Sequence, residues 1–185
     1  VRSRRQRQMC IRDRGSFIPD KTFRELRHLT RYRKSIVHDI TAQKNRIDKF
    51  LQSSGFRFAA FLSDTFGASG RNIIRHLMEY GSISREALDK CLKTQTRKRI
   101  DEILIALNGS LSEHQRGFLR MIFEHLEALE QHRHSVENAI AEEITKHEKA
   151  LSLLCSIPGI DVTAAAAIIA EIGTDMSAFP DLSLI

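Results

Sequence analysis

A long amphipathic segment extends from Asp20 to Ser54 and contains neither glycine nor proline. Mostly apolar residues recur along it at alternating intervals of three and four positions, which places them in one narrow stripe on a helix. This pattern is typical of the a/d seam of a coiled coil. Two polar residues, Arg33 and Gln43, interrupt this stripe. Its members are Leu26, Leu29, Arg33, Ile36, Ile40, Gln43, Ile47 and Phe50. With Asp20 as the N-cap and Gly55 as the C′ residue, the pattern predicts a helix about 50 Å long.

A second seam follows Ser112, which has the spacing of a capping box with Gln115. Pro158 stops the pattern, and the segment predicts one helix of roughly 60 Å with Gly117 as its weak position. The stripe first runs through Leu119, Ile122, Leu126, Leu129, Arg133, Val136 and Ile140. It then shifts in phase and continues through Ile144, Leu151 and Leu154.

Shorter elements separate the two long helices. The turn at 66–71 predicts a helix capped by Ser69, Gly81 predicts a break, and residues 84–93 and 97–107 predict further helices. A narrow apolar stripe needs a partner, so the simplest arrangement is an antiparallel coiled coil closed by a small helical tip. The predicted fold class is therefore all-α. The alternative is two separate amphipathic helices on a globular core, which the narrowness of both seams disfavours.

The composition agrees with long helices, because tryptophan is absent and only three prolines occur. No run of 18 apolar residues exists, so no membrane span is predicted. Cys10, Cys91 and Cys155 lie too far apart for a clustered zinc site, and we predict no metal site. Isolated thiols are typical of a reducing, cytoplasmic compartment.

The net charge of +6 is distributed unevenly along the chain. Residues 1–57 hold 16 Lys/Arg and 5 Asp/Glu, whereas residues 58–185 hold 13 and 18. Six of the arginines lie in residues 1–14, which predict a disordered basic arm or a non-native segment. Residues 15–57 alone still hold ten basic and four acidic residues. A basic end on a nearly neutral body indicates a polyanionic partner, usually nucleic acid; a solvated helix face is the alternative.

Eight basic residues on the first long helix are the main candidates for nucleic-acid binding, because a stiff rod can present several cations to one phosphate track. They are Arg24, Arg27, Arg31, Arg33, Lys34, Lys44, Arg46 and Lys49.

Other motifs are weaker. The GASG string at 67–70 lacks the Lys-Ser/Thr of a phosphate loop, and no HExxH string accompanies the histidines of the second helix. We assign the acidic and histidine side chains of that helix to its solvated face.

A second candidate contact lies at 153–161, where an apolar helix end and a Pro-Gly turn precede an Ala-rich helix at 162–173. This arrangement resembles a helix-hairpin-helix, whose amides bind a DNA phosphate without reading sequence. Asp161 stands where the usual motif has a second glycine; a carboxylate there disfavours phosphate but caps the next helix well. The structural alternative is a tight turn that packs its isoleucines into a core. The candidate residues are Ile157, Pro158, Gly159 and Ile160.

Six strings carry a family resemblance: FRELR at 23–27, RYR at 31–33, QKNR at 43–46, LSDTFGASGR at 62–71, SIPGI at 156–160 and IAEIGTDM at 169–176. At this spacing they resemble insertion-sequence transposases of the IS110 type, the Piv-like recombinases. The N-terminal domain of that family is RuvC-like with a DEDD carboxylate set. The resemblance extends over about residues 15–185.

The resemblance implies an enzyme that cuts and rejoins DNA. In the family, acidic residues of the RuvC-like domain bind divalent metal such as Mg²⁺, a coiled-coil insert mediates dimer contact, and a C-terminal domain supplies a catalytic serine. Some members are guided by a structured RNA from the element itself. We expect the carboxylates to lie before Phe17 and the serine after Ile185, so no residue here is assigned a catalytic or metal role.

Three segments are therefore predicted: a basic arm at 1–14, a coiled-coil insert at 15–150 and the start of a C-terminal transposase domain at 151–185. The expected function is that of the central part of a DNA transposase, inactive by itself, in the bacterial cytoplasm at the nucleoid. DNA, a guide RNA and a second copy of the chain are the candidate partners. The alternative is a non-enzymatic helical module that binds nucleic acid or forms coiled-coil oligomers.

Overall fold

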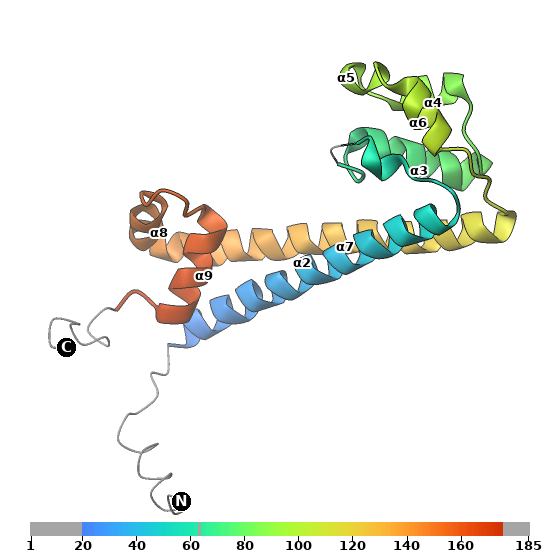
Figure 1. Ribbon diagram of the computed structural model, residues 1–185. Coiled ribbons are helices and arrows are strands. Elements are labelled where there is room, and N and C mark those ends of the chain that lie inside the picture. Colours follow the sequence, from blue (N-terminus) through green and yellow to red (C-terminus); the bar gives the residue numbers. More distant parts are fainter. Residues whose placement is uncertain (1–19, 63, 176–185) are drawn as a thin grey trace, which may run out of the picture. The chain divides into compact units, whose positions relative to one another are not determined.

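The computed structural model describes residues 20–62 and 64–175, and every regular element in these ranges is a helix (Figure 1). The predicted all-α class is thus confirmed for the described part of the chain; the predicted basic arm lies outside it. The long helices are α2 (Lys21–Ser53) and α7 (Glu113–Ile144). The elements between them are a 3-10 turn (Phe58–Ala60), α3 (Ala68–Tyr80), α4 (Arg85–Cys91), α5 (Thr94–Arg97) and α6 (Ile100–Ala106). A 3-10 turn (Thr145–His147), α8 (Glu148–Cys155) and α9 (Val162–Ile172) follow α7.

The chain divides into two compact units, and both long helices contribute to each. Unit 1 contains α2 up to Lys34 and the chain from Ser135 onward, and unit 2 contains residues 35–134. In unit 1, Phe23 stacks on His147 with ring centroids 4.7 Å apart. Farther along α2, Arg33 Nη2 lies 2.8 Å from Glu137 Oε1. From the first contact to the second, the residue numbers rise along α2 and fall along the partner segment. In unit 1, α2 therefore runs antiparallel to the end of α7.

Unit 2 shows the same direction of pairing. The Gln43 amide donates a hydrogen bond to the Ile122 carbonyl at 2.8 Å. Later on α2, the Phe50 ring lies 5.1 Å from the ring of Phe118, which is earlier on α7. The predicted antiparallel pairing of the two long helices is therefore present in each unit.

The predicted stripe of α2 is largely buried. Leu26, Ile36, Ile40 and Ile47 are at most 5% exposed. The polar position Gln43 is also buried, and its hydrogen bond to α7 satisfies the amide there. On α7 the buried positions are Leu119, Ile122, Phe123, Leu126, Val136, Ile140 and Ile144. Each fully buried aliphatic side chain contributes about 1.5–3 kcal/mol relative to an exposed one, so burial of the two stripes stabilises the pairing of α2 with α7.

The second long helix is shorter than predicted. The sequence predicts one helix up to Pro158, but α7 ends at Ile144 and a 3-10 turn separates it from α8. The Thr145 hydroxyl donates to the Glu142 carbonyl at 2.6 Å, and the His147 backbone leaves the helical region at φ −123° and ψ 32°. The apolar stripe shifts in phase at this point, so a straight helix could not keep burying the same face. The break allows α8 to pack against α9 instead.

The predicted helix ends are confirmed at two places. After α2, the Phe56 amide donates to the Leu51 carbonyl at 2.9 Å, and Gly55 takes the left-handed conformation with φ +90°. These features define a Schellman motif, in which glycine avoids the strain of a side chain. At the start of α7, the Ser112 amide donates to Gln115 Oε1 at 2.9 Å, and the Gln115 amide donates to Ser112 Oγ at 3.3 Å. This reciprocal pair is the predicted capping box.

The cap predicted for α3 is wrong. Gly67, not Ser69, is the N-cap, and Ser69 Oγ accepts a hydrogen bond from the Lys93 amide at 3.1 Å. Because the helix begins one residue before Ser69, that hydroxyl is left to satisfy a distant backbone group. The predicted break at Gly81 is confirmed, with φ +78°. The two helices predicted for 84–93 and 97–107 are present as α4 and α6, with the short α5 between them.

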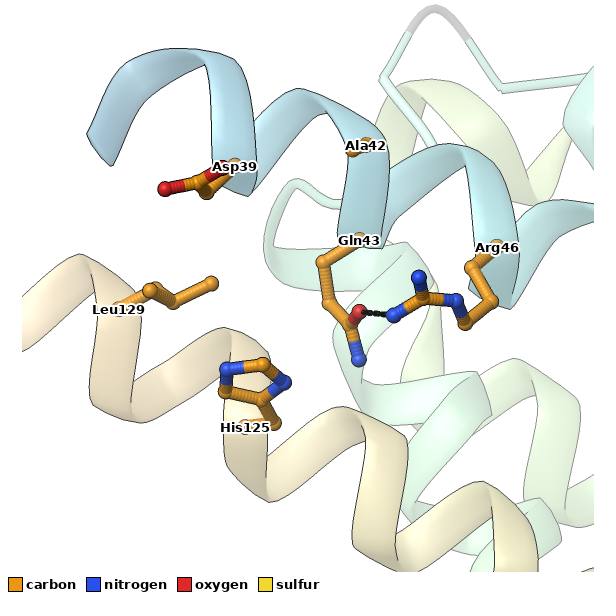
Figure 2. Close-up of a pocket in the computed structure, with 6 residues that line it drawn as sticks. All are labelled: Asp39, Ala42, Gln43, Arg46, His125 and Leu129. Carbon is orange, nitrogen blue, oxygen red and sulfur yellow. Dashed lines mark hydrogen bonds between the residues drawn. The ribbon is translucent and has the colours of Figure 1, made fainter. Parts of the chain in front are cut away.

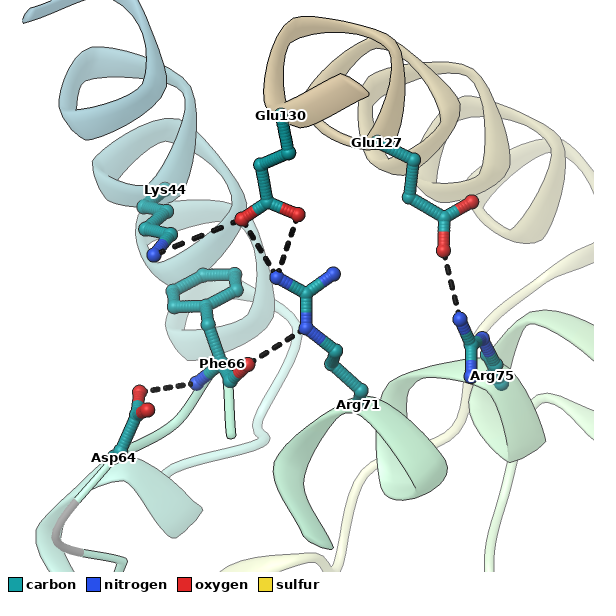
Figure 3. Close-up of polar contacts among 7 residues, drawn as sticks. All are labelled: Lys44, Asp64, Phe66, Arg71, Arg75, Glu127 and Glu130. Atoms are coloured by element: carbon teal, nitrogen blue, oxygen red, sulfur yellow. Dashed lines mark hydrogen bonds and ion pairs between the residues drawn. The ribbon is translucent and has the colours of Figure 1, made fainter. Parts of the chain in front are cut away.

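A polar cluster within unit 2 links α3 to α7, and α2 joins the cluster through the same α7 carboxylate (Figure 3). Arg71 Nη2 donates to both carboxylate oxygens of Glu130 on α7, at 2.7 and 2.8 Å. Lys44 Nζ on α2 lies 3.8 Å from the same carboxylate, and Arg71 Nε donates to the Phe66 carbonyl at 2.7 Å. The Arg71 and Glu130 side chains are only 20% and 24% exposed, so water screens this pair weakly.

We expect Glu130→Gln to lower the free energy of unfolding by about 1.5 kcal/mol, since it removes a charge-assisted and partly buried interaction. Glu127→Gln on the same helix is the matched control. Glu127 pairs with Arg75, whose side chain is 56% exposed, so a loss below about 1 kcal/mol is expected. Urea denaturation of the two variants measures the difference, and equal losses would contradict the structural weight given to the Glu130 cluster.

We also expect Gly117→Ala to stabilise the chain by about 0.5–1 kcal/mol, because glycine in a helix interior carries an entropic cost. No heavy atom lies within 4 Å of the position that a Cβ would take at this exposed site. Gly70→Ala is the opposite case, since its Cβ would lie 1.8 Å from the Thr65 carbonyl oxygen. Thermal melting should rise for the first variant and fall for the second; a fall for both would show that Gly117 is needed for another reason.

Candidate nucleic-acid interface

The part of α2 in unit 1 presents four basic side chains on the side opposite its buried stripe. Their spacing of three, four and three residues places them on one helix face. We call Arg24, Arg27, Arg31 and Lys34 the outer basic face. Arg24, Arg31 and Lys34 are exposed and Arg27 is half-buried, so solvent reaches the whole row.

Two members of the outer basic face contact the end of α9, an arrangement that we call the α9 clasp. Arg27 donates to the Ala170 carbonyl at 3.1 Å and to the Glu171 carbonyl at 2.7 Å. Arg31 donates through two nitrogens to the Glu171 carboxylate, at 2.8 and 2.9 Å. The last carbonyls of a helix lack partners within it and carry the negative end of its dipole, so a guanidinium is well suited to them.

The clasp keeps its charges at neutral pH. Arg31 donates hydrogen bonds to the Glu171 carboxylate, and this contact holds the pKa of Glu171 below its ordinary value, with the charges of Arg31 and Arg27 adding to the effect. The same hydrogen bonds raise the pKa of Arg31. The side chains of Arg31 and Glu171 are 65% and 43% exposed, so solvent screens their attraction.

The other predicted basic residues of α2 fall into two groups. Arg33 pairs with Glu137 at 2.8 Å, and Lys44 lies 3.8 Å from Glu130, so both charges are used within the fold. Lys49, like Arg24 and Lys34, is exposed and forms no ion pair with any described residue. Arg46 is also exposed and donates to the Gln43 side-chain oxygen. The sequence pattern treats all eight cations alike, whereas the structure separates those used in packing from those open to a ligand.

Glu171 is the interface residue that sequence reasoning missed. It lies inside the family string at 169–176, but nothing near it in the sequence indicates a partner on α2. Its contacts to Arg27 and Arg31 join residues 144 and 140 positions apart, respectively. A contact of this kind depends on how α9 packs, so local spacing carries no signal of it.

A polar recess of about 270 Å³ lies between α2 and α7 in unit 2 (Figure 2). Gln43, one of its lining residues, is buried, and its amide donates to the Ile122 carbonyl of α7. The lining residues are Asp39, Ala42, Gln43, Arg46, His125 and Leu129. Over residues 20–62 and 64–175, neither this recess nor any other place gathers three His, Cys, Asp or Glu side chains that could hold a metal ion.

The hairpin between α8 and α9 has the shape that the sequence predicts. Gly159 takes φ +90°, and Asp161 caps α9 by accepting a hydrogen bond from the Ala164 amide at 2.7 Å. Ile157 is 48% exposed and Ile160 is half-buried, so the turn does not pack both isoleucines into a core. The Asp161 carboxylate occupies the helix N-terminus that a phosphate would use in a helix-hairpin-helix, which weakens the hairpin as an anion site.

Comparison with known proteins adds one match. A family model for DEDD transposases of the IS110 type matches residues 6–55, which include α2 with all eight predicted basic residues. The matched range begins inside the segment 1–14, for which the sequence predicts a basic arm or a non-native segment. It confirms the family resemblance over this part of the chain. No curated protein and no solved structure matches the chain.

Among the described helices, none combines the length and apolar character needed to cross a bilayer.

Proposed function

Because its residues 6–55 belong to the DEDD transposase family of the IS110 type, we propose that this chain is a helical nucleic-acid-binding part of a DNA transposase. The observation that carries the proposal is that the family match falls on the helix that bears the outer basic face. Its task would be to hold nucleic acid while other parts of the enzyme cut and rejoin DNA.

The outer basic face suits a phosphate backbone. Arg24 and Lys34 are ten residues apart, so about 15 Å of helix separates them, which is the span of several phosphates. Cations on a rod bind such a track through charge and carry no sequence information, so the predicted contact is to the backbone and not to base edges. Recognition of a particular site would then come from elsewhere in the enzyme or from a guide RNA.

The remaining assignments follow from the family and from the shapes of the two units. We propose that residues 15–150 form the coiled-coil insert, through which two copies associate, and that 151–185 begin the C-terminal transposase domain with its helix-hairpin-helix-like turn. The antiparallel pairing of α2 and α7 supports the first assignment, and the α8–α9 hairpin supports the second. Exposed apolar side chains on α7, Met121 at 66% and Phe118 at 40%, favour self-association. The bacterial cytoplasm, at the nucleoid, is the proposed location.

Divalent metal has no fitting donor set in the described residues, since no three carboxylate, imidazole or thiolate side chains come together there. No Mg²⁺-dependent step is therefore assigned to these residues. In the proposal, metal belongs to the DEDD carboxylates of the RuvC-like domain, and nucleophilic chemistry belongs to the serine of the C-terminal domain.

We expect the double variant Arg24→Gln, Lys34→Gln to weaken binding of a short DNA duplex and to flatten its salt dependence. The slope of log affinity against log salt should fall by about 0.9 for each lost phosphate contact. Fluorescence anisotropy across a salt series measures both quantities. Lys90→Gln with Lys98→Gln is the charge-matched control on exposed residues of unit 2, and it should retain most of the affinity.

A hairpin variant tests the competing contact surface. Ile157→Asp adds a carboxylate at an exposed position without disturbing Gly159, and we expect it to change duplex affinity much less than the α2 variant. Loss of binding in Ile157→Asp, with normal binding in the α2 variant, would move the contact to the hairpin and overturn this part of the proposal.

We expect the purified chain to bind DNA without cutting or joining it, with Mg²⁺ or without. Phosphodiester chemistry in this family needs clustered carboxylates and a serine nucleophile, and neither is assigned here. Incubation with supercoiled plasmid, followed by gel electrophoresis, is the measurement. Reproducible nicking that disappears when one residue of this chain is replaced would contradict the expectation.

A further inference from the structure

The carboxylate of Glu171 occupies the outer basic face in the way that a phosphate would. Its two oxygens accept hydrogen bonds from two nitrogens of Arg31, and Oε2 lies 3.2 Å from Arg27 Nε. Bidentate contact of this kind is the geometry in which arginine binds both carboxylates and phosphates. One anion therefore already bridges two of the four cations in the row.

We infer that Arg27 and Arg31 form a phosphate-binding site and that Glu171 is its internal competitor, which keeps the site closed until a nucleic-acid phosphate displaces the carboxylate. The inference rests on the proposed function: within the same interface, it specifies which residues bind the phosphate and which residue blocks them. The competing anion belongs to α9, so binding at α2 would release one of the restraints on that helix.

The site is accessible to such an exchange. Arg31 and Glu171 are both substantially exposed, so a phosphate can approach Arg31 without unfolding either helix. Arg27 is only 21% exposed and stays bonded to the α9 carbonyls, so it adds its positive charge from beside the exchanged anion. Arg24 and Lys34 lie on the same face and add attraction for a backbone that follows the row. A monovalent phosphate replaces a monovalent carboxylate in the exchange. We call the closure of the Arg27–Arg31 site by Glu171 the lock; its strength depends on how well α9 holds Glu171 in place.

When the Glu171 carboxylate leaves Arg31, other hydrogen bonds and buried side chains still hold α9 in place. Arg27 still donates to the Ala170 and Glu171 carbonyls, which are backbone atoms that a side-chain change does not remove. The helix also buries Ala165, Ala166, Ile169 and Ala170. A variant that lacks the carboxylate should therefore fold, which makes the lock testable by substitution.

Glu171→Gln in the full chain is the direct test, with a fluorescent DNA duplex as the probe. We expect affinity at low salt to rise about fivefold and the salt slope to steepen by about 0.9, since one more phosphate is neutralised. Glu142→Gln is the charge-matched control in unit 1, because Glu142 is exposed and its carboxylate pairs with no described residue. Adding Arg31→Gln to Glu171→Gln should abolish the gain.

Glu171→Asp gives a second test at unchanged net charge. Its shorter side chain reaches Arg31 less well, so a smaller gain in affinity is expected. Circular dichroism checks whether both variants keep their helices. If the wild type binds DNA and neither Glu171 variant binds it more tightly, the clasp is structural only, and the lock fails while the proposed function stands. A gain in Glu142→Gln equal to that in Glu171→Gln would also overturn the lock. If neither the wild type nor Glu171→Gln binds DNA, both proposals are wrong.

Discussion

A helix as long and as narrowly amphipathic as α2 is stable only where its apolar stripe is covered, because local hydrogen bonding barely offsets the entropy lost in ordering the backbone. The stripe from Leu26 to Phe50 is largely buried, and α7 runs antiparallel beside it in each unit. This burial fixes the rotation of α2 about its own axis. The opposite side must then face outward, and in unit 1 that side holds Arg24 and Lys34. The position of the candidate interface is thus a consequence of how the helix is packed.

The same rotation explains why cations of one helix serve different purposes. Arg33 lies in the stripe, where a charge needs a partner, and it pairs with Glu137. Lys44 lies beside the stripe in unit 2 and approaches Glu130. Arg27 and Arg31 lie farther round the helix, where the end of α9 supplies carbonyls and a carboxylate. Basic charge on α2 is therefore partly structural, and its total overstates the charge available to a ligand.

Features that depend on local spacing could be predicted from the sequence. The stripe of α2, its glycine end at Gly55 and the capping box at Ser112 each involve residues within a few positions of one another. Features that depend on distant partners could not. Ser69 is not the cap because α3 begins before it, and its hydroxyl then accepts from the distant Lys93 amide. Glu171 becomes part of the interface only when α9 packs near α2. The break after Ile144 is an intermediate case, since the phase shift of the stripe is visible but does not say whether the helix bends or ends.

Nuclear magnetic resonance of the isotope-labelled chain, titrated with a short DNA duplex, can show whether nucleic acid contacts the outer side of α2. Arginine Nε–Hε signals and backbone amide signals report contacts residue by residue. We expect the largest shifts on Arg24, Arg31 and the amides of α2 around Lys34. Saturable binding with shifts confined to the turn at 156–161, and none along α2, would contradict this expectation.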